Sequence, residues 1–313
     1  MIRSARVLLV AGALAALAAC NRHPQEKPNT MDAAAVAFQH EEDAWRAQRR
    51  DTLLKPDGWT SLVGLHWIDP GAHYVGSAAG NGIQLSMGPA HLGMLELRDG
   101  GFRLVPDESA ALTLDGKPLA GATALRTDAD KAGPSVIGFD GGKGNATVIE
   151  RSGRYALRVR HADAPSRTGF AGLDYWPAER DWKIEGRFLP HPPGRTMEIA
   201  NIIGSTDAMA NPGVVEFQRD GRTYRIEALD EGEGVLFLVF ADRTNGHGSY
   251  GAGRFLDTPM PDAQGRVVLD FNQARNPPCA FTAFATCPLP PPENRLDLAV
   301  TAGEKAYRKP SHG

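Results

Sequence analysis

Short apolar runs separated by glycine-containing turns constrain the fold of this chain more than any other feature. Residues 92–97 and 102–105 flank one such turn, and residues 146–150 and 155–161 flank another. Asp-Gly and Ser-Gly pairs readily adopt the positive φ angles of tight hairpins, and four of those in this chain lie between apolar runs: Asp99-Gly100, Asp115-Gly116, Ser152-Gly153 and Asp220-Gly221. The 35 glycines and 23 prolines favour turns and β structure over long helices. We therefore expect a mainly β protein built from antiparallel hairpins.

One helix and two β units are expected along the chain. Residues 31–54 carry the one convincing helical pattern, with Asn29 or Thr30 as its cap and arginines near its end. The sequence predicts a small antiparallel β sandwich over 55–130 and a larger antiparallel β sandwich or barrel over 131–308. Within the larger unit, the run VLFLVF at 235–240 predicts a central strand buried on both faces.

The N-terminus has the three regions of a secretory signal peptide. Arg3 and Arg6 precede an uncharged apolar run over 7–19, which ends in Leu-Ala-Ala before Cys20. The run is about 13 residues, shorter than the roughly 20 needed to span a bilayer. The sequence Leu-Ala-Ala-Cys matches the bacterial lipobox, so we expect residues 1–19 to be removed and Cys20 to be lipidated. An ordinary secreted protein with a chance cysteine is the alternative.

Lipidation would place the protein in the bacterial envelope, bound to the membrane through Cys20. Residues 20–30 are polar and read as a tether. Asn21 after the lipidated cysteine favours the outer membrane, with the protein facing the periplasm. Loss of Arg3 and Arg6 would take the formal charge from −3 to −5. An acidic protein without a basic field is not expected to bind nucleic acid.

Cys279 and Cys287 are the two cysteines left after lipidation. In an oxidising compartment an even pair predicts a disulfide, here closing a loop of about nine residues. A reactive thiol pair and a pair of metal ligands are the alternatives. No histidine lies within ten residues of either cysteine, and the C-x7-C spacing is not that of zinc sites. We therefore expect no metal and no cofactor.

Two polar segments of the larger β unit could carry function. The first follows the run 235–240 and contains Asp242, Arg243, His247, Tyr250 and Arg254. The second is proline-rich and contains Asp270, Asn272, Asn276 and Asn294. Such side chains could line a cleft that binds a small molecule or a glycan. They could equally be turn residues with an internal Asp–Arg ion pair.

Three functions are compatible with these residues. The first is a lipid-anchored binding or structural module of the envelope, with a polar cleft in the larger β unit. The second is a hydrolase or other enzyme that uses Asp242, His247, Tyr250 and Asp270, and the third is a thiol-active protein that uses the cysteine pair. The sequence contains no GxSxG, GxxxxGK[ST] or HExxH motif. Either of the first two functions would require Asp242, Tyr250, Arg254 and Asp270 to converge at one cleft.

The smaller β unit resembles a forkhead-associated sandwich in its succession of short strands. Gly76, His91 and the Asp115-Gly116 turn are part of this resemblance. Those domains read phosphothreonine with an arginine after the glycine, where this chain has Ser77. Without that cation, phosphopeptide binding has no physical basis, so the resemblance implies only the fold.

Several segments resemble the bacterial family known as domain of unknown function 1684. They are GWTSLVGLHWI, DRTNGHGSYGAGRF, the block from NPPCAF to TCPLPPPEN, and AGEK. The resemblance covers about residues 40–308, and the proline-rich block is its most specific part. It implies a β-rich architecture in an envelope or secreted setting. It implies no reaction and no catalytic residues.

Overall fold

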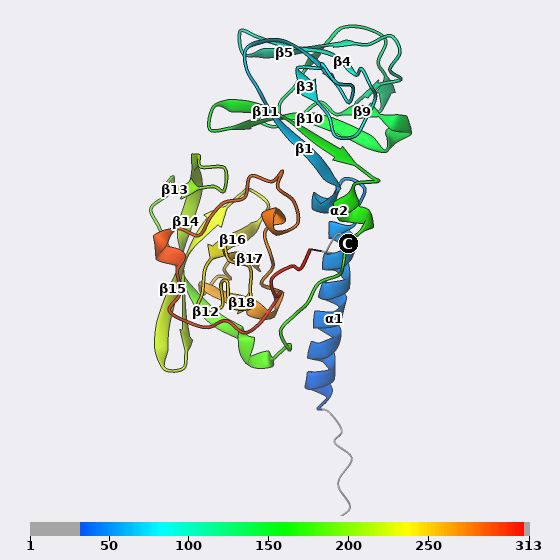
Figure 1. Cartoon of the computed structure of the whole chain (residues 1–313). Coiled ribbons are helices and arrows are strands. Elements are labelled where there is room, and N and C mark those ends of the chain that lie inside the picture. The colour runs from blue at the N-terminus through cyan, green and yellow to red at the C-terminus, as the bar shows by residue number, and fades with distance from the viewer. Residues whose placement is uncertain (1–31, 310–313) are drawn as a thin grey trace, which may run out of the picture.

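The computed structural model describes residues 32–309. The signal peptide, Cys20 and the tether lie outside these residues. Within them, one long helix precedes strands that pair in antiparallel sheets, with β2 and β3 as a short parallel exception (Figure 1). The expectation of a mainly β protein with an N-terminal helix is confirmed.

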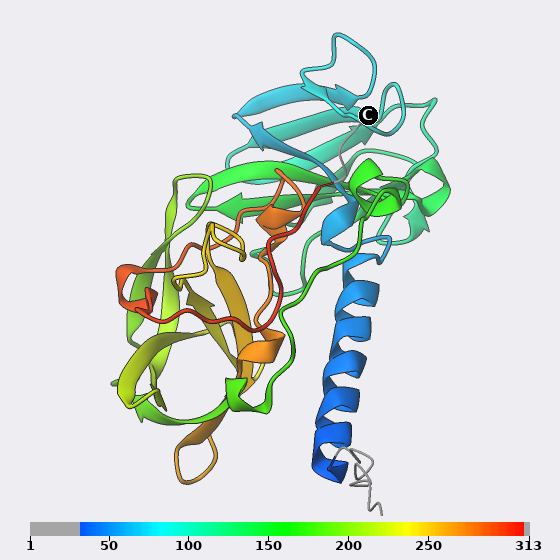
Figure 2. The same ribbon diagram turned by 60° about the horizontal axis from the view of Figure 1, so that its bottom comes forward.

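Helix α1 (Ala33–Leu53) lies alongside the strands of residues 183–270 in both views (Figure 1, Figure 2). Asp32 caps it by accepting from the N–H of Ala34, in place of the expected Asn29 or Thr30. At its other end, Leu53 is fully buried against Ala280 and Phe281. In residues 32–309, no helix is long and apolar enough to cross a membrane.

The first β unit consists of two sheets over one shared core. One sheet has the order β1-β11-β10-β9-β6-β7 and the other β3-β2-β4-β5-β8. The strands are β1 (Leu62–Ile68), β2 (Gly71–Gly76), β3 (Ile83–Gln84), β4 (Gly93–Arg98), β5 (Gly101–Pro106), β6 (Thr113–Leu114), β7 (Lys117–Pro118), β8 (Thr123–Leu125), β9 (Ile137–Phe139), β10 (Gly144–Arg151) and β11 (Arg154–His161). The unit therefore ends about thirty residues later than the expected boundary at 130, because β9 to β11 complete its six-stranded sheet. The short helix α2 (Pro165–Thr168) follows it.

The second β unit is a nearly closed antiparallel barrel. Its strands are β12 (Lys183–Pro190), β13 (Thr196–Ala200), β14 (Thr206–Arg219), β15 (Arg222–Asp230), β16 (Val235–Phe240), β17 (Arg254–Pro259) and β18 (Arg266–Asp270). They follow the order β17-β16-β15-β14-β12-β18, with β13 paired to β14. The hydroxyl of Thr258 on β17 donates to the carbonyl of Val268 on β18 at 2.7 Å, which brings the two end strands together.

Strand β16 is buried on both faces, as its apolar run predicts. Leu236 and Leu238 belong to the main barrel core, whereas Phe237 and Val239 belong to a second cluster on the other face. That second cluster includes Cys287 and packs against Trp59, which precedes β1. β16 lies next to the end strand β17 rather than at the centre of the sheet, and its outer face brings the barrel into contact with Trp59, next to the first β unit.

The hairpin of β10 and β11 is the part of the first β unit that lies nearest the barrel (Figure 1, Figure 2). The hydroxyl of Ser152 at its turn donates to Asp207 on β14 at 2.7 Å. Arg151 also donates to the hydroxyl of Thr286 in the proline-rich loop at 3.2 Å. These contacts define a junction between the two β units.

Candidate functional site

Asp242 and Arg254, two of the residues expected to line a cleft, form an ion pair inside the barrel. Nη2 of Arg254 lies 2.7 Å from Oδ2 of Asp242, and both side chains are fully buried. The guanidinium also donates to the carbonyl oxygens of Val300 and Ala302, at 2.8 and 2.5 Å. Burial lowers the pKa of Arg254, and the charge of Asp242 acts in the opposite direction. The pair ties the C-terminal segment to the barrel and is closed to solvent.

The amides of Asn272 and Asn294 bind the backbone. Oδ1 of Asn294 accepts from the N–H of Glu227 at 2.7 Å, and its Nδ2 donates to the carbonyls of Glu227 and Val239, both at 2.9 Å. Asn272 pairs in the same two-way manner with the backbone of Glu179, at 3.0 and 2.9 Å. Both amides hold loops onto the barrel.

Asp270 and Asn276 lie on the side of the barrel that faces α1. Oδ1 of Asp270 accepts from the backbone and the side chain of Asn272, and its Oδ2 lies 3.6 Å from Nζ of Lys183. Asn276 is fully buried and donates to the carbonyl of Lys305 at 2.7 Å. Within residues 32–309, neither side chain is hydrogen-bonded to Asp242 or Arg254.

The other three candidates lie elsewhere again. Arg243 is an exposed partner of Asp297, and His247 is exposed, with Nδ1 3.1 Å from a backbone carbonyl. Tyr250 is half-buried, and its hydroxyl donates to the carbonyl of Cys279 at 3.4 Å. The contacts of the sequence candidates are therefore divided among separate parts of the barrel and its loops. Of these candidates, Asn276 lines the pocket described below.

Cys279 and Cys287 are both free thiols in the structure, without the expected disulfide. The backbone N–H of Cys279 lies 3.1 Å from Sγ of Cys287, so the two residues are adjacent. A hydrogen bond from the Cys287 thiol lowers the pKa of Cys279, and the hydroxyl of Tyr250 acts in the same direction. The same hydrogen bond raises the pKa of Cys287, and burial adds to this. The disulfide stays a prediction.

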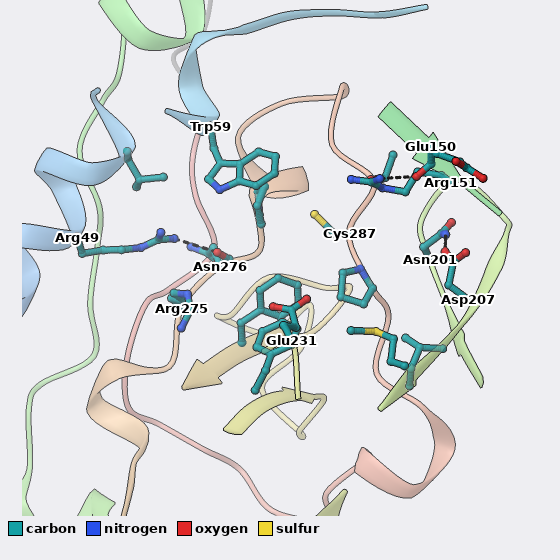
Figure 3. A pocket seen from close by; sticks show the side chains of 18 residues that line it. Arg49, Trp59, Glu150, Arg151, Asn201, Asp207, Glu231, Arg275, Asn276 and Cys287 are labelled. Atoms are coloured by element: carbon teal, nitrogen blue, oxygen red, sulfur yellow. Dashed lines mark hydrogen bonds between the residues drawn. The ribbon is translucent and has the colours of Figure 1, made fainter. Parts of the chain in front are cut away.

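A pocket with a volume of about 580 Å³ lies at the junction of α1, the first β unit and the barrel (Figure 3). Figure 3 shows Arg49 and Trp59 on one side and Arg151 and Asp207 on the other, with Cys287 between them. The volume is in the range of pockets that hold small organic molecules. We take this pocket as the candidate functional site.

One wall of the junction pocket is apolar and largely aromatic. It contains Trp59, Phe237 and Phe255, together with Ile199 and Met209. The rings of Phe237 and Phe255 meet edge to face, with their centroids 4.9 Å apart. Aromatic side chains provide rigid, flat surfaces on which another ring can pack.

Three arginines line the pocket, and each is held by a carboxylate. The nitrogen–oxygen distances are 2.7 Å for Arg49, 2.7 Å for Arg151 and 2.9 Å for Arg275. Arg49 also donates to the backbone carbonyl of Asn276 at 3.0 Å, which joins α1 to the pocket wall. These fixed guanidinium groups give the pocket polar edges at set positions.

Three acidic side chains also line the pocket: Glu150, Asp207 and Glu231. Asp207 accepts from Nδ2 of Asn201 at 3.2 Å in addition to its bond from the β10–β11 turn. Glu231 is exposed at the pocket edge, yet the protein packed around it, and then the charge of Glu233, raise its pKa. The lining thus carries both signs of charge.

The barrel and the loops that follow it match a known family model. Residues 168–305 match the model described as a protein of unknown function, DUF1684. These residues form a DUF1684 domain. The match begins after the first β unit, so it is shorter than the resemblance over about 40–308 noted from the sequence.

Comparison with other known proteins adds little to this. No curated protein matches the chain. Among solved structures, the chain is similar to the solution NMR structure of an uncharacterized protein from Haloarcula marismortui, with 31% sequence identity. That match covers 47% of this chain and 81% of the other, with a TM-score of 0.38.

The junction pocket is only partly a feature of the DUF1684 domain. The domain supplies Phe237, Phe255 and Cys287, whereas Trp59 and Arg151 come from the segment before it. Sequence reasoning missed Trp59 and Arg151. Arg151 at the end of β10 and the alternating Arg158 and Arg160 on β11 were visible, but the same pattern describes a strand face in contact with water. In residues 32–309, no group of three or more His, Cys, Asp or Glu side chains is placed to hold a metal ion.

Proposed function

We propose that this protein is a lipid-anchored envelope protein whose junction pocket binds a small organic molecule. The observation that carries the proposal is one cavity of about 580 Å³ with an aromatic wall and several fixed polar groups around it. Ligand sites in proteins typically combine such an apolar surface with a few placed polar groups that orient the ligand. Binding pockets also form preferentially between domains, as this one does.

The pocket favours a ligand with one flat ring or chain and several polar groups. Trp59 and the two phenylalanines offer a stacking surface, and Asn201 and Asn276 contribute amides. An aromatic metabolite or a sugar would match this lining. The lining holds the carboxyl groups of Glu150, Asp207 and Glu231 besides Cys287, and its aromatic wall supports binding of a ligand that contains a ring.

A fluorescence titration with N-phenyl-1-naphthylamine, an uncharged aromatic probe, tests the pocket. We expect saturable one-to-one binding that weakens at least tenfold in Trp59→Leu. Trp67→Leu is the matched control, because Trp67 lies on β1 at a different hollow, next to Arg154. Thermal unfolding of each variant checks that it folds. Absence of saturable binding, or equal weakening by both substitutions, would refute the pocket as the site.

The envelope location is a separate part of the proposal and depends on the N-terminal sequence. Labelled palmitate should be incorporated into the wild-type protein in cells and not into Cys20→Ala. Incorporation that persists in Cys20→Ala would refute the anchor. In an oxidising compartment, denatured and unreduced Cys20→Ala protein should show no free thiol, whereas two free thiols would refute the disulfide of Cys279 and Cys287.

A further inference from the structure

Arg158 on β11 is a buried cation without a carboxylate partner. It is 6% exposed, and it makes no ion pair with any carboxylate of residues 32–309. Its one hydrogen bond runs from Nη2 to the hydroxyl of Thr286 and is long, at 3.5 Å, and its Nε has no partner. A buried charge without a partner costs several kcal/mol in general, so it calls for a physical explanation.

The Thr286 hydroxyl, at the wall of the junction pocket, accepts hydrogen bonds from two arginines. Nε of Arg151 donates to it at 3.2 Å, in addition to the long bond from Arg158. Thr286 and Arg151 both line the pocket. Two guanidinium groups therefore converge on one neutral oxygen, where an anionic oxygen would be a far stronger acceptor.

The surroundings of Arg158 add more positive charge. Arg160, two residues along the same strand face, also has an Nε without a partner. The guanidinium carbons of Arg158 and Arg160 lie 5.6 and 6.0 Å from the ring centroid of Trp59, a pocket residue. Burial, and then repulsion by Arg151 and Arg160, lower the pKa of Arg158 to about 10. The charge of Asp128 offsets part of this decrease in pKa, but Asp128 is already paired with Arg151.

We propose that the ligand of the junction pocket is an amphipathic anion, whose carboxylate, phosphate or sulfate group binds between Arg158, Arg151 and Thr286. This rests on the proposed function, since it names the ligand class of the same pocket. The anion would accept from the two guanidinium groups, and the apolar part of the ligand would lie on the aromatic wall. Arginine is suited to this role because its planar fork can bind two oxygens of one anionic group.

Two fluorescent probes that share a ring system separate this inference from the proposed function. 1-Anilinonaphthalene-8-sulfonate carries a sulfonate, and N-phenyl-1-naphthylamine lacks it. In Arg158→Gln we expect the affinity for the sulfonate probe to fall at least about tenfold, as expected for loss of a charge-assisted hydrogen bond. The affinity for the uncharged probe should change less than about twofold. Arg225→Gln, which removes an exposed arginine paired with Glu216, should change neither.

Competition identifies the anionic group. Acetate, inorganic phosphate and sulfate are each titrated against the bound sulfonate probe, in wild type and in Arg158→Gln. We expect at least one of them to displace the sulfonate probe from the wild type and none to displace the uncharged probe. The anion that competes best indicates whether the ligand carries a carboxylate, a phosphate or a sulfate.

The outcomes are distinguishable. If the uncharged probe binds through Trp59 but Arg158→Gln weakens both probes equally or neither, the anionic ligand is refuted and the pocket stands. If no probe binding depends on Trp59, the proposed function itself fails. Thermal unfolding of Arg158→Gln provides a second readout: a large loss of stability together with equal weakening of both probes would show that Arg158 has a structural role.

Discussion

Two buried arginines, Arg254 in the barrel and Arg158 at the junction, differ in what their surroundings provide. Both are nearly inaccessible to solvent, at 0% and 6% exposure, and both lie over an aromatic ring, Phe240 at 5.4 Å and Trp59 at 5.6 Å. Arg254 donates to a carboxylate and to two carbonyl oxygens. Arg158 has one long bond to a hydroxyl. Burial alone therefore does not indicate whether a charge is structural; the set of acceptors around it does.

The difference separates the two regions by role. In the barrel interior, the charges and amides that the sequence suggested as a site hold the loops and the C-terminal segment. Nε of Arg254, Oδ2 of Asp270 and Oδ1 of Asn276 have no hydrogen-bond partner there, but each of these side chains is held through its other polar atoms. At the junction, Arg158 donates only to a hydroxyl, whereas the three arginines that line the pocket each have a carboxylate partner. A region that supports the fold is expected to be internally satisfied, and a binding region is expected to lack the group that its ligand brings.

The largest expected effect comes from breaking the satisfied pair. Asp242→Asn removes the carboxylate that is paired with Arg254 and leaves the guanidinium without its ion-pair partner in the core. We expect the free energy of unfolding to fall by about 3–5 kcal/mol, measured by urea denaturation. The matched control is Glu216→Gln, which breaks an exposed pair with Arg225 and should have a much smaller effect. Similar losses in the two variants would mean that the buried pair has no special role.

The local part of the fold could be predicted from the sequence because its cause is local. Asp99, Asp115, Ser152 and Asp220 all have φ near +50°, each followed by a glycine with positive φ, so the turn residues fixed the hairpins directly. The buried strand β16 followed from its unbroken apolar run. The end of the first β unit was misplaced because β9 to β11 return to pair with β1 and β6, which are distant in sequence.

The site was harder to predict because its parts are not local. Arg49, Trp59, Arg151 and Thr286 come from segments up to 237 positions apart and meet only in the folded chain. The polar residues that the sequence did suggest are close to one another in sequence, and the structure uses most of them for turns and internal bonds. The sequence had left open the alternative that these residues form an internal Asp–Arg ion pair, and Asp242 does form such a pair with Arg254. In this chain, polar residues that cluster in the sequence therefore mostly form internal hydrogen bonds that stabilise the fold rather than line a cleft.

Glu42 on α1 extends the comparison to a buried acid. We expect its substitution to have an intermediate effect on the free energy of unfolding. Glu42 is fully buried and its Oε2 has no partner. Burial, and then the charge of Asp270, raise its pKa to about 7 from an ordinary value of 4.5. Gln273 and Arg46 act in the opposite direction, whereas Glu41 adds to the rise. The charged form of Glu42 is therefore disfavoured in the fold.

The sign of the pH dependence follows from that shift. Because the pKa of Glu42 is raised in the fold, its contribution to the free energy of unfolding is fully present below about pH 4.5. This contribution is lost as the pH rises through about 7, and the loss amounts to up to about 3 kcal/mol. Glu42→Gln should remove this decline and be the more stable protein at pH 8, measured by urea denaturation over a pH series. Glu41→Gln, which changes the exposed neighbour paired with Lys183, should keep the decline. A wild type whose stability does not fall between pH 5 and 8 relative to Glu42→Gln would contradict the assignment.

The smallest expected effect on the free energy of unfolding concerns Arg158, the arginine at the junction. Arg158→Met replaces the guanidinium with an apolar side chain that fits a buried position, and it leaves only the Thr286 hydroxyl without a donor from β11. Because the removed charge had no carboxylate, we expect the free energy of unfolding to stay constant or to rise by about 1 kcal/mol. Arg254→Met should instead destabilise the protein, since it leaves Asp242 charged and unpaired in the core. Equal destabilisation by the two substitutions would show that Arg158 has acceptors of its own and that the junction is as internally satisfied as the barrel.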